Sequence, residues 1–157
     1  MGDDGRMPEL IVLTWEQLDA LVARLAGAVG REHDIVLAIS RGGLVPAGML
    51  AYRLELRQIL VAGVEFYTAD GGTHPEPRFL QFPEDQLLAG RRVLIVDEVW
   101  ETGETMAAVL ARVRAAGGLP RSAVLHYKPG RSRVDERPDH WAAEVEDWVR
   151  YPYKAGA

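Results

Sequence analysis

The sequence has 157 residues, 48% of them hydrophobic, which is enough to bury the core of one domain. A net charge of −5 and a pI near 5.4 give no general attraction to nucleic acids or acidic membranes, and we expect neither as a partner. The chain has no cysteine, which excludes disulfides, thiolate metal sites and cysteine nucleophiles. Residues 1–9 are polar and no apolar run reaches the roughly 18 residues that span a bilayer, so we predict a cytoplasmic protein.

The first half of the chain alternates helix and strand signals. A capping box at 14–17 begins a run of apolar residues at helical spacing, which predicts an amphipathic helix that ends at Gly30. The following residues predict a buried strand, a glycine-containing turn, a helix with a proline in its first turn, and another strand. These lie at 35–39, 40–43, 44–53 and 59–66.

The stretch between Tyr67 and Pro83 is polar, contains three prolines and an Asp-Gly-Gly turn, and is longer than ordinary connections. We interpret it as a mobile lid that hinges beside Tyr67 and Thr68. An insertion without function is the alternative, because long loops cost little conformational entropy.

The second half continues the alternation, with strands predicted at 92–96 and 123–127 and a helix at 105–116 that two glycines end. Residues 131–139 mix both charge signs and predict a solvated connection, with a subunit contact as the alternative. Strands that alternate with helices predict an α/β fold, a parallel twisted sheet with helices on both faces. Ligands then bind at the carboxyl ends of the strands.

The most informative motif lies at 93–106, where an apolar strand runs into two acids and then a Thr-Gly-x-Thr turn that opens a helix. Free amides at a helix start favour a phosphate monoester, and Gly103 allows close approach of the backbone. The carboxylates of Asp97 and Glu98 suit the hydroxyl donors of a ribose. The motif therefore predicts a sugar-phosphate site. Four apolar residues followed by two acids also occur in P-loop ATPases, but no G-x-x-x-x-G-K-[ST] motif is present in the chain.

This motif resembles the signature of the type I phosphoribosyltransferases, which bind phosphoribosyl pyrophosphate (PRPP). The purine enzymes of that family usually have Asp where this chain has Glu101, and a second Asp is commoner at Glu98. Over nearly the whole chain the resemblance is closest to the small prokaryotic xanthine-guanine and hypoxanthine-guanine (6-oxopurine) enzymes. It implies a single domain, 1–157, with a small base-recognition hood formed by the C-terminal segment, 128–157.

The Ser-Arg-Gly-Gly turn at 40–43 can wrap its backbone around an anion, and Arg41 supplies a cationic fork. By itself this motif is equally typical of a plain strand-to-helix turn. It resembles the pyrophosphate loop of the xanthine-guanine enzymes, including the Leu-Val-Pro that follows. That resemblance implies a cis peptide bond between Ser40 and Arg41.

Two C-terminal segments resemble the base-recognition elements of the same family. An ammonium at Lys128 can donate to the O6 and N7 acceptors of a 6-oxopurine, and the indole of Trp148 can stack on the base. The carbonyl of Val149 is expected, by resemblance, to accept from a guanine amino group. Alone, Trp148 would be interpreted as a core or interface aromatic. Relatives often have acids where this chain has Arg150 and Lys154.

The resemblance implies an enzyme that joins guanine, xanthine or hypoxanthine to PRPP and releases pyrophosphate and the nucleoside 5′-monophosphate. Glu101 is the expected catalytic residue, and Mg²⁺ is expected as cofactor, held mainly through PRPP, with Asp97 and Glu98 as further candidate ligands. We expect a homodimer, with a tetramer as the alternative. A phosphoribosyltransferase for another base and a PRPP-sensing regulatory protein of the same fold remain open.

The predicted binding residues fall into four groups. For the ribose and 5′-phosphate they are Asp97, Glu98, Thr102, Gly103, Glu104 and Thr105; for pyrophosphate, Ser40, Arg41, Gly42 and Gly43; for the base, Lys128, Trp148 and Val149; and for the lid, Tyr67 and Thr68.

Overall fold

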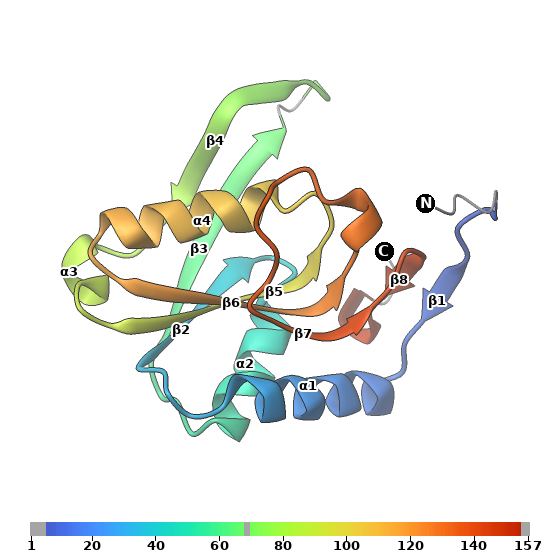
Figure 1. The fold of residues 1–157 in the computed structure, drawn as a ribbon, viewed down its shortest axis with the longest axis horizontal. Helices are drawn as coiled ribbons and strands as arrows, with labels where there is room; N and C mark the ends of the chain where they lie inside the picture. Colours follow the sequence, from blue (N-terminus) through green and yellow to red (C-terminus); the bar gives the residue numbers. More distant parts are fainter. Residues whose placement is uncertain (1–5, 68–69, 155–157) are drawn as a thin grey trace.

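The computed structural model of the protein describes residues 6–67 and 70–154. Its main element is a twisted sheet of six strands in the order β4-β3-β2-β5-β6-β7, parallel except for the antiparallel pair of β3 and β4 (Figure 1). This confirms the predicted fold class. In chain order the elements are β1 (Leu10–Val12), α1 (Trp15–Val29), β2 (Ile35–Ser40), α2 (Leu44–Arg53), β3 (Ile59–Tyr67), β4 (Thr73–Gln81), α3 (Asp85–Leu88), β5 (Arg92–Trp100), α4 (Glu104–Ala115), β6 (Leu119–Tyr127), the 3₁₀ turn η1 (Pro129–Arg131), β7 (His140–Glu144), β8 (Trp148–Arg150) and η2 (Pro152–Lys154).

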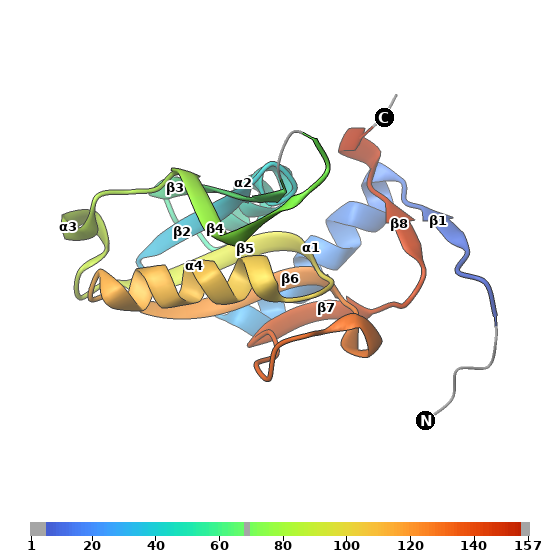
Figure 2. The same cartoon turned by 90° about the horizontal axis from the view of Figure 1, so that it is seen from above.

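Helices cover both faces of the sheet, and the alternation of side chains along each strand supplies both layers. Val36 and Ala38 of β2 pack with α1 and α2, whereas Leu37 and Ile39 pack on the opposite face with α3 and α4. Figures 1 and 2 show α1 and α2 together on one side of the sheet and α4 on the other. Strands that are buried on both faces read as continuous apolar runs, and this is why β2 and β5 are recognisable in the sequence.

The stretch predicted as a lid is mostly a strand, so its prediction as a loop is wrong. β4 pairs with β3 at both of its ends, from Thr73 to Gln81, with two irregularities in register. Its two prolines are compatible with a strand because β4 lies at the edge of the sheet, where one side of the backbone needs no strand partner. Tyr67 is the last residue of β3, and Thr68 lies outside the described residues. Closure over the site stays a prediction.

A second, two-stranded sheet joins the two ends of the described chain. β1 pairs in parallel with β8, with Ile11 opposite Val149, and Figure 2 shows the two strands side by side away from the main sheet. The segment 128–157, predicted as the hood, therefore includes β7 of the main sheet, and the small sheet takes one of its two strands from the N-terminal region. Within the described ranges, none of the helices has the length and apolar character needed to span a membrane.

Candidate active site

The loops predicted to bind phosphates and the base meet at one edge of the sheet. The turn at 40–43 follows β2, the loop at 101–103 follows β5, and Lys128 follows β6, and these strands are parallel neighbours. The backbone amide of Lys128 donates to the carbonyl of Trp100 at 3.0 Å, which joins two of the loops directly. The three predicted segments therefore occupy the carboxyl edge, where open parallel sheets bind ligands.

The turn at 40–43 leaves β2 through a cis peptide bond between Ser40 and Arg41, as the resemblance implied. Gly43 has no room for a side chain, because a Cβ atom there would lie 2.4 Å from the carbonyl oxygen of Val96. The turn is thus pressed against the sheet edge, while the Arg41 side chain is exposed. Because no buried partner engages the Arg41 guanidinium, it is available to bind an anion.

β5 runs past its predicted end at 96 to Trp100, so Asp97 and Glu98 lie within the strand and point to opposite sides of the sheet. The Oδ1 atom of Asp97 accepts the backbone amide of Glu98 at 2.7 Å. Although Asp97 keeps some exposure to solvent, protein atoms surround its carboxyl group, and this burial raises its pKa to about 7. The two acids, predicted to act together on the ribose, therefore occupy different environments.

A cavity of about 100 Å³ lies between the end of β5 and the start of α4. Gly103 has a φ of +84°, and a Cβ atom there would collide with the indole of Trp100. The backbone amide of Glu104 donates to Oγ1 of Thr102 at 3.3 Å. The cavity thus has a carboxylate at one end, and threonine hydroxyls and the first amides of α4 at the other end. This arrangement suits a ribose 5-phosphate. The cavity is lined by Asp97, Val99, Trp100, Glu101, Thr102, Gly103, Thr105 and Met106.

Glu98 lies on the other side of β5 and both of its oxygens are engaged. The Tyr153 hydroxyl donates to Oε2 at 2.6 Å, and the Lys154 ammonium donates to Oε1 at 2.5 Å. The side chain is nearly buried and packs directly on Gly42, where an added Cβ atom would lie 2.5 Å from Cδ of Glu98. Glu98 thus connects the C-terminal segment to the 40–43 turn.

The residues predicted to bind the base converge, with one addition. The Nζ atom of Lys128, a residue only 3% exposed, lies 5.0 Å from the ring centre of Trp148 and 3.8 Å from Oε1 of Glu101. Arg131 reaches the same Glu101 oxygen at 3.2 Å, and its guanidinium carbon lies 5.4 Å from the Trp148 ring centre. Two cations, one carboxylate and a half-exposed indole therefore form one cluster.

The backbone of β8 gives Val149 a defined orientation. The amide of Trp148 donates to the carbonyl of Glu9, and the amide of Leu13 donates to the carbonyl of Arg150. Because backbone groups of successive residues in a strand face alternate sides, the carbonyl of Val149 is directed away from β1. β1 therefore leaves this carbonyl unused, and its contact with the base stays a prediction.

The segment 131–139 is solvated over residues 135–137, as its mixed charges predict, but its first residues also contact the 101–103 loop. Besides the contact of Arg131 with Glu101, the Oγ atom of Ser132 accepts the indole N–H of Trp100 at 3.1 Å, and the amide of Arg133 donates to the carbonyl of Thr102 at 2.8 Å. The segment therefore covers the 101–103 loop. The turn η1, with its proline and glycine, returns the chain towards β5, but the charge pattern carries no sign of this return.

Sequence reasoning also left out Tyr151, Tyr153 and a positive role for Lys154. The Tyr151 hydroxyl donates to the carbonyl of Glu98 at 3.2 Å and lies 2.8 Å from Nδ1 of His126. Tyr153 stacks on Tyr151 with ring centres 5.5 Å apart. The two tyrosines flank Pro152 in the sequence. This closely spaced pair of aromatic residues could have indicated that the segment packs against the core.

A carboxylate can hold a magnesium ion only through free lone pairs. No group of three metal-ligating side chains occurs among residues 6–67 and 70–154. Glu98 is already engaged by two donors, whereas Asp97 accepts one amide and lines the β5 cavity. One carboxylate fits a magnesium ion that a substrate's phosphates largely coordinate.

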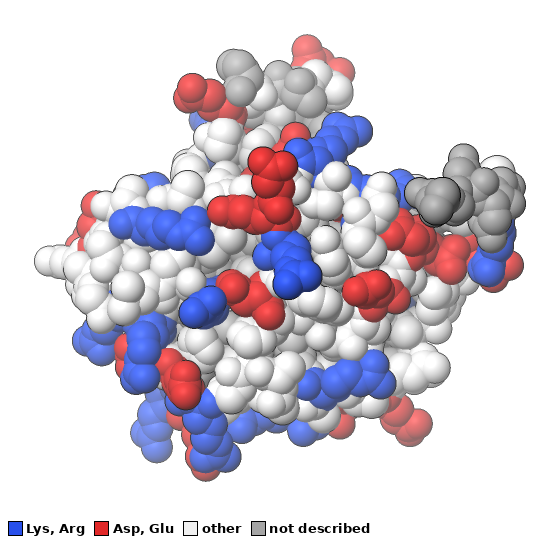
Figure 3. Space-filling model, viewed as in Figure 1, with Lys and Arg blue, Asp and Glu red and all other residues white. Residues whose placement is uncertain are grey.

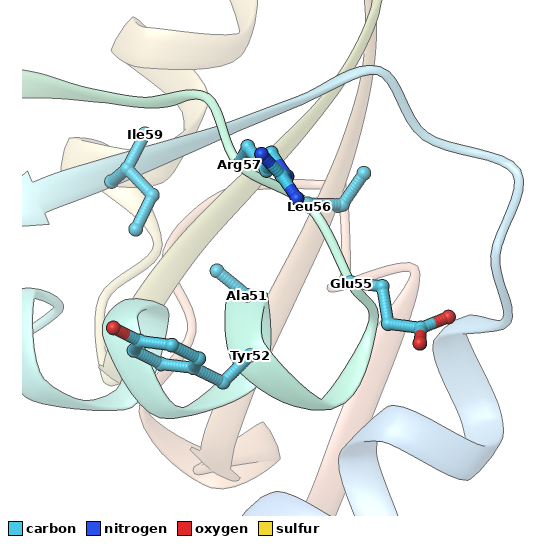
Figure 4. A pocket seen from close by; sticks show the side chains of 6 residues that line it. All are labelled: Ala51, Tyr52, Glu55, Leu56, Arg57 and Ile59. Atoms are coloured by element: carbon cyan, nitrogen blue, oxygen red, sulfur yellow. The ribbon is translucent and has the colours of Figure 1, made fainter.

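Another cavity, of about 560 Å³, lies at the opposite edge of the sheet (Figure 4). It contains none of the predicted site residues, and its polar groups do not form a catalytic constellation. It is lined by Ala51, Tyr52, Glu55, Leu56, Arg57 and Ile59.

Comparisons with known proteins agree with this geometry. The model of the phosphoribosyl transferase domain matches residues 12–152. The chain is 31% identical to the xanthine-guanine phosphoribosyltransferase of Gluconobacter oxydans over 90% of its own length and 82% of that protein. A purine phosphoribosyltransferase from Pyrococcus horikoshii has a similar structure, with a TM-score of 0.76, 29% identity and coverage of 92% and 93% of the two chains.

A hypothetical protein from Neisseria gonorrhoeae, solved with bound ppGpp, is also similar, with a TM-score of 0.80 and 28% identity over 96% of this chain and 92% of that one. The family match, the curated relative and the fold all point to the same group as the residues at the carboxyl edge. This chain belongs to the phosphoribosyltransferase family.

Proposed function

We propose that this protein transfers the 5-phosphoribosyl group of PRPP to a 6-oxopurine, giving the nucleoside 5′-monophosphate and pyrophosphate. The observation that carries the proposal is the cluster of Lys128, Trp148 and Glu101 beside the β5 phosphate loop. An ammonium that is almost fully buried can only donate, so it selects a base with acceptors at O6 and N7. The names of the xanthine-guanine and purine relatives support the same substrate class.

In this reaction the bond from C1′ to the purine nitrogen forms as the bond from C1′ to pyrophosphate breaks. The sugar becomes oxocarbenium-like, and the leaving group takes the electron pair. The carboxylate of Asp97 accepts hydrogen bonds from the ribose hydroxyls. Thr102, Thr105 and the amides at the start of α4 donate hydrogen bonds to the 5′-phosphate. The turn at 40–43, with Arg41, binds the pyrophosphate.

Glu101 lies between the base cluster and the β5 cavity, since it contacts Lys128 and also lines that cavity. Its carboxylate accepts the proton that the purine loses, or stabilises the positive charge that develops on the ring. Arg131 contacts the same oxygen of this carboxylate at 3.2 Å.

Magnesium, when bound with PRPP, neutralises charge on the departing pyrophosphate. Asp97 is the protein residue that would contact it, alongside the phosphates of PRPP. The predicted homodimer and the cytoplasmic location remain predictions, and light scattering of the purified protein tests the first.

The deciding experiment is turnover of guanine, xanthine, hypoxanthine, adenine and a pyrimidine with PRPP and magnesium, followed by identification of the nucleotide. We expect the three 6-oxopurines to react and adenine to be a poor substrate. Exclusive use of another base would overturn the base assignment but leave phosphoribosyl transfer intact.

A regulatory protein that senses PRPP is the rival from another class. It predicts no turnover with any base and salt-dependent binding to RNA or DNA. Figure 3 shows acidic and basic side chains interspersed on the face seen in Figure 1, which favours the enzyme over a protein that binds a polyanion across this face. A titration with labelled nucleic acid at two salt concentrations separates the two classes.

A further inference from the structure

The C-terminal turn η2 faces the 40–43 turn across a cavity of about 600 Å³. This cavity lies on the Glu98 side of β5, whereas the smaller cavity of the β5 loop lies on the Asp97 side. Two cations line it from separate elements, Arg41 from the turn after β2 and Lys154 from η2. Leu44, Val45 and Tyr153 give it partly apolar walls.

We propose that Lys154 is a second cationic ligand of the pyrophosphate group, acting opposite Arg41. This inference rests on the proposed function and adds to it a residue whose type departs from the acids common at this position. The Lys154 side chain is about two-fifths exposed, so its ammonium reaches the cavity while it contacts Glu98. An ammonium has three donors, and one hydrogen bond to Glu98 leaves two for phosphate oxygens.

Glu98 explains why a cation is needed at this place. Its carboxyl group packs against Gly42, so a negative charge lies directly behind the turn that is to bind a highly charged anion. Without a partner, this carboxylate would repel the pyrophosphate across a few ångströms. Lys154 neutralises this charge, and the Tyr153 hydroxyl donates to the second oxygen of Glu98 at 2.6 Å while it lies 3.3 Å from the Gly42 carbonyl oxygen.

The position of the Lys154 ammonium is also restricted by its contacts with neighbouring side chains. Its Nζ atom lies 5.6 Å from the ring centre of Tyr151, the buried residue that donates to the Glu98 carbonyl. Tyr153 stacks on the same ring. The ammonium is therefore positioned by contacts to β5 before any ligand arrives, as a preorganised binding group requires.

The chain contains only two lysines among its 18 basic residues, Lys128 and Lys154, and both lie at this edge of the sheet. The protein with isotope-labelled lysine will therefore give two ammonium resonances in a nitrogen-detected spectrum, and the spectrum of Lys154→Arg assigns them. Pyrophosphate alone, with magnesium, is the probe. We expect it to move the Lys154 resonance far more than the Lys128 resonance.

Calorimetric titration with pyrophosphate then measures the energetic contribution. Loss of a charge-assisted hydrogen bond weakens binding by about ten- to a hundredfold, and we expect this for Lys154→Met. Lys154→Arg keeps the positive charge and its donors and should weaken binding much less than Lys154→Met does. Arg57→Met removes one positive charge at the opposite edge of the sheet and should leave binding unchanged.

The outcomes separate the inference from the proposed function. If wild-type protein transfers phosphoribose and Lys154→Met, folded by its melting temperature, binds pyrophosphate as tightly as wild type, Lys154 is not a ligand and the function stands. A pyrophosphate-induced shift confined to the Lys128 resonance has the same meaning. If wild-type protein neither binds pyrophosphate nor turns over any base, both the inference and the proposed function fail.

Discussion

At the scale of single residues, Glu101 shares one carboxylate oxygen with two cations from different segments, Lys128 and Arg131. The Arg131 hydrogen bond restricts the carboxylate, and its other oxygen is left to accept a proton from the base, as general acid–base catalysis requires. Lys128 is the more constrained of the two cations, because it is nearly buried. Substitutions at Glu101 and Lys128 should therefore have separable kinetic effects.

Glu101→Gln keeps the size of the side chain and removes its charge. We expect kcat to fall by roughly 10²- to 10⁴-fold, the usual scale for a lost acid–base group, while PRPP affinity changes little. Steady-state kinetics with guanine and a PRPP titration measure the two quantities. Glu136→Gln, a change at an exposed ion pair with Arg114, is the control and should be neutral. Unchanged kcat for Glu101→Gln would remove this residue from the mechanism.

Lys128→Met removes the ammonium and keeps an unbranched side chain. The O6 acceptor of the base then loses its donor in a desolvated pocket, which costs about 1–3 kcal/mol, or roughly ten- to 150-fold in kcat/KM. Guanine, xanthine and hypoxanthine should be affected alike, because all three share O6. PRPP affinity should hardly move. Intact guanine turnover in this variant would contradict the 6-oxopurine assignment.

At the scale of elements, burial decides what the sequence predicts. The strands β2 and β5 are covered on both faces, so their apolar runs are unambiguous. β4 is an edge strand with two prolines, and β8 has three residues whose strand partner lies near the other end of the chain. Neither pattern carries a strand signal by itself, because the stabilising contacts are non-local.

The turn between β2 and α2 offers a test at this scale, because the backbone there approaches β5 too closely for a Cβ atom. Gly43→Ala should destabilise the fold by about 1–3 kcal/mol through overpacking and should weaken pyrophosphate binding. Gly48→Ala in α2, where nothing lies within 4 Å of the added atom, is the matched control and should stabilise the helix by about 0.8–1 kcal/mol. Chemical denaturation measures both changes. Equal stability of the two variants would show that the turn relaxes.

At the scale of the whole molecule, the predicted sites and the fold were accessible because the family motifs lie on the connections that leave the carboxyl ends of the strands. The contacts between those connections were not accessible. Arg131, Tyr151 and Lys154 reach partners that lie 30, 53 and 56 positions earlier in the chain, and local pattern says nothing about such pairs. These three side chains complete the active site, and only its glycines and acids can be recognised from motifs in the sequence.

The burial of His126, next to the Lys128 charge, makes stability depend on pH. Burial lowers the pKa of His126 from 6.5 to about 4, so the folded state binds fewer protons than the unfolded state between these values. This contribution to stability is complete above pH 6.5 and is lost as the pH falls towards 4. The shift corresponds to about 3 kcal/mol.

Comparison of wild type with His126→Gln isolates this effect, since Asp97, whose raised pKa acts in the opposite direction, is present in both. We expect the stability difference between the two proteins to change by about 3 kcal/mol in favour of His126→Gln between pH 6.5 and 4, measured by urea unfolding. If the stability of the two proteins changed in parallel with pH, the titration of His126 would not be the cause of the pH dependence.

The pairing of β1 with β8 has a consequence for the order in which the molecule is assembled. The segment that carries Trp148, Val149 and Lys154 has its strand partner at residues 10–12, about as far away along the chain as the fold allows. A chain that emerges from the ribosome makes its phosphate loops and most of the sheet first. Until residues 148–154 have been synthesised and have docked against β1, the nascent protein has its phosphate loops and Lys128 but lacks the indole that stacks on the base and the second cation for pyrophosphate.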